Sequence, residues 1–134
     1  MPKIKRTYGF PIMHKIVQPA SSGKVEVEHF ELSKGFVQHE KQMSSFRGGD
    51  GWLWVSGLKA GVYTRMTEGG TCWMSDTWME RYTNAAMLKA ARGDVLVAGL
   101  GIGMVAVALC RKREVKSVTV LEINADVIKC IAPQ

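Results

Sequence analysis

Three glycines at alternating positions and one glutamate are the residues of this chain whose types and spacing indicate chemistry. The glycines are Gly99, Gly101 and Gly103, and they follow the strand-like run 94–98, which is apolar from Val95 onward. Because glycine has no Cβ, the main chain can turn sharply there and a ligand can approach it closely. Glu122 follows the next apolar run, where Rossmann-like sites place a carboxylate that accepts hydrogen bonds from ribose hydroxyls. The pattern predicts a nucleotide site.

A strand, a turn, a helix and a second parallel strand are needed to position these residues. We expect strands over 94–98 and 118–121 with an apolar helix between them, as in the first half of a Rossmann-like sheet. A buried strand-turn-helix unit without a ligand is one alternative. A membrane span is another, because 95–110 is uncharged and precedes a basic triplet at 111–113. A span needs about 20 apolar residues, and this run is shorter and interrupted by glycines.

The residue that follows the glycine turn distinguishes between classes of nucleotide. Dinucleotide-binding turns have the pattern G-x-G-x-x-G or G-x-G-x-x-A, whose last small residue allows the helix to pack closely on the strand. That position is Met104 here, which disfavours NAD and FAD. The spacing G-x-G-x-G over 99–103 instead resembles the first motif of class I S-adenosylmethionine-dependent methyltransferases.

Within that superfamily the chain resembles the spermidine-synthase-like branch. Val97 stands where most class I methyltransferases have an acid, and spermidine synthases also lack that acid. The separation of Gly99 and Glu122 matches theirs, and 115–128 looks like their second-strand motif. The resemblance is good over the C-terminal part and loose over the part that precedes it. The turn itself differs, because it offers Leu100 and Ile102 where spermidine synthases usually have a richer turn with an acid inside it.

The resemblance implies an S-adenosylmethionine site. Gly99, Gly101 and Gly103 would then pass beneath the methionyl part of the ligand. Glu122 would accept both ribose hydroxyls, and Ile123 would lie along the adenine. Methyl transfer is the expected reaction. Aminopropyl transfer from decarboxylated S-adenosylmethionine is the alternative reaction. The alternative that is not an enzyme is a non-catalytic binding or assembly module. The family's proton-accepting acid lies on a later loop, so no catalytic residue is assigned.

The expected fold is α/β, with a β-rich N-terminal segment over 1–75 and a partial Rossmann-like S-adenosylmethionine-binding domain over 76–134. At 134 residues and 46% hydrophobic composition, the chain can bury one modest core. A complete doubly wound sheet normally needs more residues. We therefore expect either a fragment of a longer reading frame or a homo-oligomer that covers the exposed edge of the second strand.

Strands and one helix are expected ahead of the glycine turn. The segment 36–51 is polar, with a turn at 48–51, and a bulge is expected near Phe30. Gly69 and Gly70 indicate a hairpin. The expected strands are 24–32, 52–58, 61–67 and 71–75.

The capping-box pattern Thr77-Trp78-Met79-Glu80 predicts a helix from Thr77 to Gly93. Its apolar face is expected to carry Met79, Tyr82, Ala86 and Ala90. Asp76, just before it, lies near the acidic substrate contacts of the resembled family, but it could equally cap the helix.

Composition narrows the classes of partner. The net charge of +6 comes from scattered lysines and arginines, and the triplet at 111–113 complements the dipole of the helix that it ends, so nucleic acid is not the expected partner. Cys72, Cys110 and Cys130 are expected to be reduced, buried thiols of a cytoplasmic protein. Neither the cysteines nor the histidines have the spacing of metal ligands, so no metal site is predicted. Four tryptophans could wall a pocket or pack in the core: Trp52, Trp54, Trp73 and Trp78.

Overall fold

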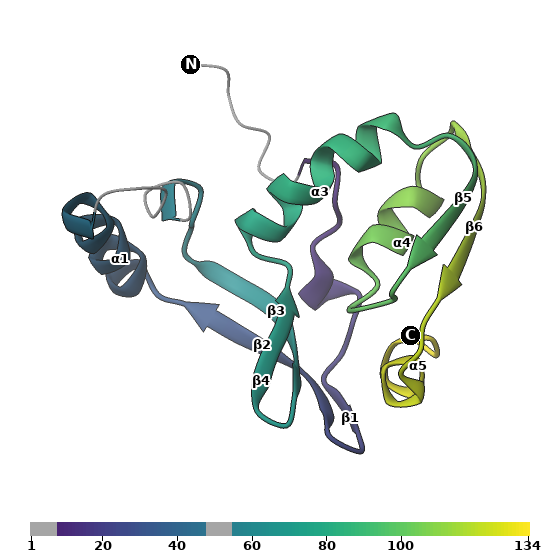
Figure 1. Cartoon of the computed structure of the whole chain (residues 1–134). Helices are drawn as coiled ribbons and strands as arrows, with labels where there is room; N and C mark the ends of the chain where they lie inside the picture. The colour runs from purple at the N-terminus through teal and green to yellow at the C-terminus, as the bar shows by residue number, and fades with distance from the viewer. Residues whose placement is uncertain (1–7, 48–54) are drawn as a thin grey trace.

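The computed structural model describes residues 8–47 and 55–134, which form two sheets. The first is antiparallel, in the order β1-β2-β3-β4, and the second pairs β5 with β6 in parallel (Figure 1). The expected α/β class, with β structure before a strand-helix-strand unit, is confirmed. The strands are β1 Ala20–Ser22, β2 Val25–Leu32, β3 Gly61–Glu68, β4 Thr71–Ser75, β5 Gly93–Ala98 and β6 Val115–Leu121. The helices are the short 3-10 helix η1 Met13–Lys15, α1 Lys34–Arg47, α3 Trp78–Ala90, α4 Met104–Cys110 and α5 Ala125–Ile131.

The hairpin of β3 and β4 forms as predicted. Gly69 and Gly70 both have positive φ, 56° and 82°, which is the backbone of a type I′ hairpin turn. The predicted bulge near Phe30 is wrong, because β2 pairs with β3 without a shift along its whole length. The irregularity lies instead between Met66 and Thr67, where β3 meets β4. The burial of β2 stops alternating before Phe30, since residues 28–30 are all half-buried.

Helix α1 was not expected from the polar sequence over 36–51. It carries no continuous apolar stripe, since Phe36 and Phe46 are exposed and Val37 is buried. The signal that could have revealed it is Ser33, whose hydroxyl accepts a hydrogen bond from the amide of Phe36 at 3.1 Å as an N-cap. The predicted turn at 48–51 lies outside the described residues.

The strand predicted over 52–58 is wrong where it can be judged. Residues 52–54 lie outside the described residues, while Val55 and Ser56 are helical. Trp52 and Trp54 therefore have no described position.

Helix α3 forms where predicted but ends at Ala90, since Gly93 already begins β5. Thr77 makes no capping bond to the helix, and its hydroxyl lies 3.0 Å from the hydroxyl of Ser75. The predicted apolar face is also wrong, because Tyr82, Ala86 and Ala90 are exposed. The buried positions are Arg81 and Leu88. A search for apolar periodicity does not identify an arginine on the inward face of a helix.

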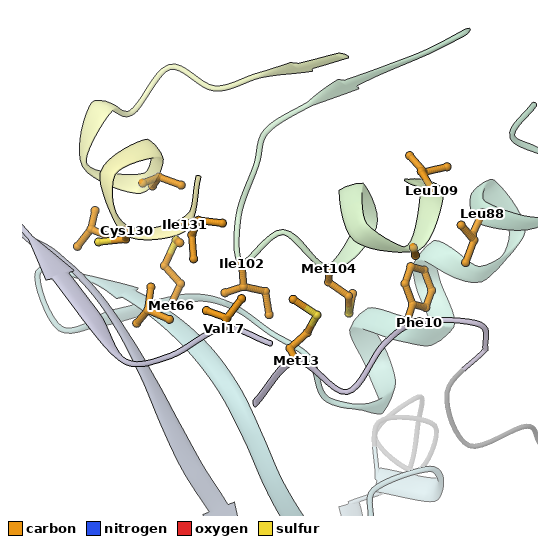
Figure 2. Packing of buried hydrophobic residues seen from close by; sticks show 14 residues of the cluster. Phe10, Met13, Val17, Met66, Leu88, Ile102, Met104, Leu109, Cys130 and Ile131 are labelled. Carbon is orange, nitrogen blue, oxygen red and sulfur yellow. The ribbon is translucent and has the colours of Figure 1, made fainter. Parts of the chain in front are cut away.

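A single core joins the two sheets. The segment that carries η1 runs between the antiparallel sheet and α4, so its side chains meet those of both (Figures 1 and 2). Met104, which is 0% exposed, lies beside Phe10 and Met13 in Figure 2 and points toward this segment. The other buried core residues are Val17, Val25, Val27, Met66, Leu88, Ile102, Ala108, Leu109, Val127, Cys130 and Ile131.

The opposite face of β5 and β6 is open. Leu96 is 64% exposed and Leu121 is 58% exposed, and within the described residues β6 pairs only with β5. An apolar face and an unpaired edge of this kind are sites where another chain can pack. The expected homo-oligomer stays a prediction.

Candidate functional site

A cleft of about 1160 Å³ runs along β5 and continues to the glycine turn and Glu122 at the carboxyl ends of β5 and β6. In parallel sheets this edge is where ligands bind. The glycine turn and Glu122 form one side, and α3 and β4 form the other. Of the predicted site residues, Gly99, Gly101, Glu122 and Ile123 line the cleft, while Gly103 does not.

Gly103 is buried and lies where the chain enters α4. It has a φ of 79° and precedes the first residue of α4. A Cβ there would lie 3.4 Å from Cγ2 of Ile131 on α5. This distance is ordinary van der Waals contact, so the positive φ, and not the packing of α5, is what favours glycine at this position.

Gly101 is approached closely by the protein itself. A Cβ at this position would overlap the sulfur of Met74, which reaches over the turn from β4. Sequence reasoning attributed this glycine to ligand approach and missed Met74, because contacts between β4 and the turn leave no signal in either segment. Gly99 has no atom within 4 Å of such a Cβ and faces open space.

Hydrogen bonds within the protein use the backbone N–H groups of the turn. Because these donors already have acceptors, the turn differs from the phosphate-binding turns whose free N–H groups surround an anion. The bonds run from Gly99 N to Leu121 O at 2.7 Å, from Leu100 N to Glu122 Oε2 at 2.8 Å, from Ile102 N to Met74 Sδ at 3.3 Å and from Gly103 N to Leu100 O at 2.9 Å.

Glu122 connects the turn to the start of α5. Its Oε2 accepts from the amide of Leu100, and its Oε1 accepts from the amide of Asn124 at 2.9 Å. Partial burial raises the pKa of Glu122, but the backbone amides around the carboxylate, first those of Asn124 and Leu100, outweigh this effect, and the net pKa is lowered. The carboxylate is therefore ionised at neutral pH and keeps lone pairs for further donors.

Carboxylates dominate the charge of the cleft. Among the described residues, four carboxylates and one cation, Arg92, line it, so this lining carries three more negative than positive charges although the chain as a whole is +6. Two of them have partners of their own: Glu68 accepts from Asn124 Nδ2 at 3.2 Å, and Asp94 accepts from the hydroxyl of Ser117 at 2.7 Å. The field in the cleft favours cationic or neutral ligands over phosphates.

Glu80 is the carboxylate of the cleft whose pKa is raised, in contrast to the lowered pKa of Glu122. Burial raises the pKa of Glu80, and the backbone amide of Ser75 lowers it only in part. The folded protein therefore binds this proton more readily than the unfolded chain. The free energy of unfolding falls as pH rises from the ordinary value of 4.5 through the raised pKa.

Glu80→Gln is accordingly expected to raise the melting temperature at neutral pH, because the variant has no buried charge to desolvate. The gain should shrink at about pH 4, where the wild-type carboxyl is largely protonated. Thermal melts at both pH values measure it, with Glu26→Gln on the exposed face of β2 as the control. A gain that is the same at both pH values would contradict this cause.

Asp76 lies outside the cleft and is a structural residue. It is 0% exposed, and its Oδ1 accepts from the amide of Thr64 at 2.7 Å. Its Oδ2 accepts from the amide of Met13 at 3.2 Å and from Nη2 of Arg81 at 3.1 Å. The carboxylate therefore joins η1, β3 and α3. This geometry fits neither of the two roles considered for Asp76, which were a substrate contact and a cap of α3.

The basic triplet at 111–113 follows α4 as expected, but its central residue acts on a different helix. Nζ of Lys112 donates to the carbonyl oxygens of Leu88, Lys89 and Ala91 at 2.8, 2.8 and 2.6 Å. These carbonyls end α3, so the cation complements the dipole of that helix.

Cysteine burial was predicted for all three residues and is wrong for two of them. Cys72 and Cys110 are exposed, because β4 presents its first residues to solvent and Cys110 ends α4. Cys130 is buried on α5. Burial raises the pKa of its thiol, and the charge of Asp126 raises it further.

Two tryptophans have described positions, and one of them lies at the cleft. Trp73, which is 68% exposed, lines it from β4. Trp78 stacks on Tyr82 with ring centroids 5.0 Å apart, and its Nε1 donates to the hydroxyl of Tyr8 at 3.2 Å. Trp73 is therefore placed to wall the cleft, and Trp78 joins α3 to the N-terminal segment.

Among residues 8–47 and 55–134, no helix is long and apolar enough to cross a bilayer. In the same ranges, no group of three His, Cys, Asp or Glu side chains could hold a metal ion. Comparison of the chain with protein-family models, curated proteins and solved structures gives no match.

Proposed function

We propose that the cleft binds the adenosyl part of S-adenosylmethionine or a closely related nucleoside. The observation that carries the proposal is the ionised carboxylate of Glu122, which lies beside a glycine turn at the ends of two adjacent parallel strands. Its two oxygens each accept one backbone amide and keep lone pairs for the two ribose hydroxyls. Ile123 and Leu100 supply apolar lining for the base.

The charge of the cleft supports a sulfonium or neutral nucleoside over a phosphorylated one. A nucleoside diphosphate would meet four carboxylates and a turn at which three amides donate to carbonyl or carboxylate oxygens of the protein. A sulfonium cation would instead gain attraction from the same carboxylates. The sulfonium is itself the activated group in this chemistry, so the protein's contribution is alignment and exclusion of water.

A methyltransferase-like reaction is the activity that we propose for the site. Aminopropyl transfer from decarboxylated S-adenosylmethionine is the second candidate, because the acidic cleft also suits the extra cationic charge of that ligand. The alternative that is not an enzyme is a binding or assembly module. A radiolabelled methyl-transfer assay beside a binding assay separates the module from the enzymes, because the module binds without turnover.

Adenosyl ligands are expected to raise the melting temperature. Methylthioadenosine, S-adenosylhomocysteine or S-adenosylmethionine at 100 times the dissociation constant contributes about 2.7 kcal/mol, which is several degrees for a domain of this size. NAD and ATP carry the same adenosine with phosphates attached. They should give no shift, because the carboxylates of the cleft repel the phosphates. Differential scanning fluorimetry provides the measurement. A shift with NAD or ATP that equals the adenosyl shift would refute the assignment.

A further inference from the structure

The side chain of Met74 covers part of the glycine turn. Its Sδ accepts the hydrogen bond of the Ile102 amide at 3.3 Å and lies against Gly101, where any larger residue would overlap it. Met74 is half-buried and lines the cleft together with Gly99, Gly101 and Leu100. It is thus a part of the cleft wall that rests on the backbone of the turn.

This contact is the one at the turn that a ligand can replace. The other amides of the turn donate to carbonyl or carboxylate oxygens, whereas a thioether sulfur is a weak acceptor. Methionine also has three rotatable bonds and adapts readily to a changed neighbour. A carboxylate on a ligand would be the stronger acceptor for the Ile102 amide, because its hydrogen bond is charge-assisted.

We propose that Met74 is a specificity-determining residue, which admits adenosyl ligands with a short methylthio tail and obliges ligands with an amino-acid tail to displace it from the turn. The inference rests on the proposed function, since it concerns the same cleft. A methylthio group carries no acceptor that needs the Ile102 amide, so it can bind with Met74 in place. An amino-acid tail carries a carboxylate and needs the space over Gly101.

The test compares two thioether nucleosides that lack a sulfonium charge, S-adenosylhomocysteine and methylthioadenosine, of which only the first has a zwitterionic amino-acid tail. Isothermal titration of each ligand is carried out on the wild type and on Met74→Ala. The variant should bind S-adenosylhomocysteine roughly fivefold more tightly, as expected for removal of one competing hydrogen bond. Its affinity for methylthioadenosine should stay within about twofold of the wild type, which is less than the free energy of one hydrogen bond.

Two further variants keep the test decisive. Met74→Val, whose branched side chain suits a strand, should show the same gain if the alanine variant folds poorly. Met87→Ala is the matched control, since Met87 lines the same cleft from α3 and should leave the ratio of the two affinities unchanged. If the ratio of the two affinities is unchanged in both Met74 variants, which includes an equal gain for both ligands, the role of Met74 is overturned while the proposed function stays intact. Failure of every variant and of the wild type to bind either nucleoside would overturn both.

Discussion

Asp76→Ala should lower the free energy of unfolding by about 3–5 kcal/mol, the cost of leaving a buried charge unpaired. The side chain of Arg81 is 8% exposed, and its Nη2 would keep only the carbonyl of Pro11 at 3.3 Å as an acceptor. The amides of Met13 and Thr64 would also lose the carboxylate. The loss is a large part of the roughly 5–15 kcal/mol that stabilises an ordinary domain. Urea unfolding followed by circular dichroism measures it.

A matched control is Glu28→Ala, which removes another carboxylate from an ion pair with arginine. Arg65 Nε and Glu28 Oε1 are 2.7 Å apart, but both side chains are about 40% exposed, so the loss should stay below about 1 kcal/mol. The double variant Asp76→Ala with Arg81→Met should recover part of the single-variant loss, because no unpaired charge remains. A cost for Asp76→Ala as small as that of Glu28→Ala would mean that water reaches the pair.

Glu122→Gln should weaken the binding of methylthioadenosine tenfold or more. Glutamine keeps one acceptor oxygen but lacks the charge, and hydrogen bonds to charged groups are each worth about 1.5–3 kcal/mol. Its amide nitrogen would also face the N–H of Leu100 or Asn124, so the glycine turn loses one of its attachments. A melting temperature a few degrees lower is therefore expected with the loss of affinity. Isothermal titration and thermal melts measure the two effects.

The lowered pKa of Glu122 sets the pH dependence of the same carboxylate. Its stabilising contribution is present above the ordinary value of 4.5 and is lost as pH falls through the lower pKa of the folded state. Affinity for the nucleoside should therefore stay level through mildly acidic pH and fall only below the ordinary glutamate range.

Glu68→Gln is the control for Glu122→Gln, because it removes one negative charge from the same cleft without contact to the turn. It should change affinity by less than about threefold, as expected for a partly screened charge. Equal losses in the two variants would assign the effect to the overall charge of the cleft. Unchanged affinity in Glu122→Gln would show that this carboxylate only supports the turn.

Local sequence patterns were sufficient wherever a structural feature depends on neighbouring residues. The strand, glycine turn, helix and second strand over 93–121 form as predicted, because glycines permit positive φ and apolar runs favour buried parallel strands. Gly69 and Gly70 similarly specify the hairpin of β3 and β4. Four of the five proposed site residues line one cleft for the same reason, since the carboxyl ends of adjacent parallel strands lie at one edge.

Features that depend on partners distant in sequence could not be predicted. Asp76 and Arg81 are charged, so apolar periodicity predicts that they are exposed. They are buried because each is the other's charge partner. The backbone amide of Met13 and the carbonyl of Pro11 supply further hydrogen bonds. Helix α1 was missed because an exposed helix needs no continuous apolar stripe.

The sequence by itself determined the glycine turn, the acid at the tip of the next strand and the α/β order of elements, because each depends on residues within one supersecondary unit. Only the tertiary structure decided what those residues touch. It places Met74 over Gly101, buries Gly103 outside the cleft and brings Lys112 to the end of α3. Such contacts join segments that are separated along the chain, so their geometry follows from how the core packs and leaves no periodic signal in either segment.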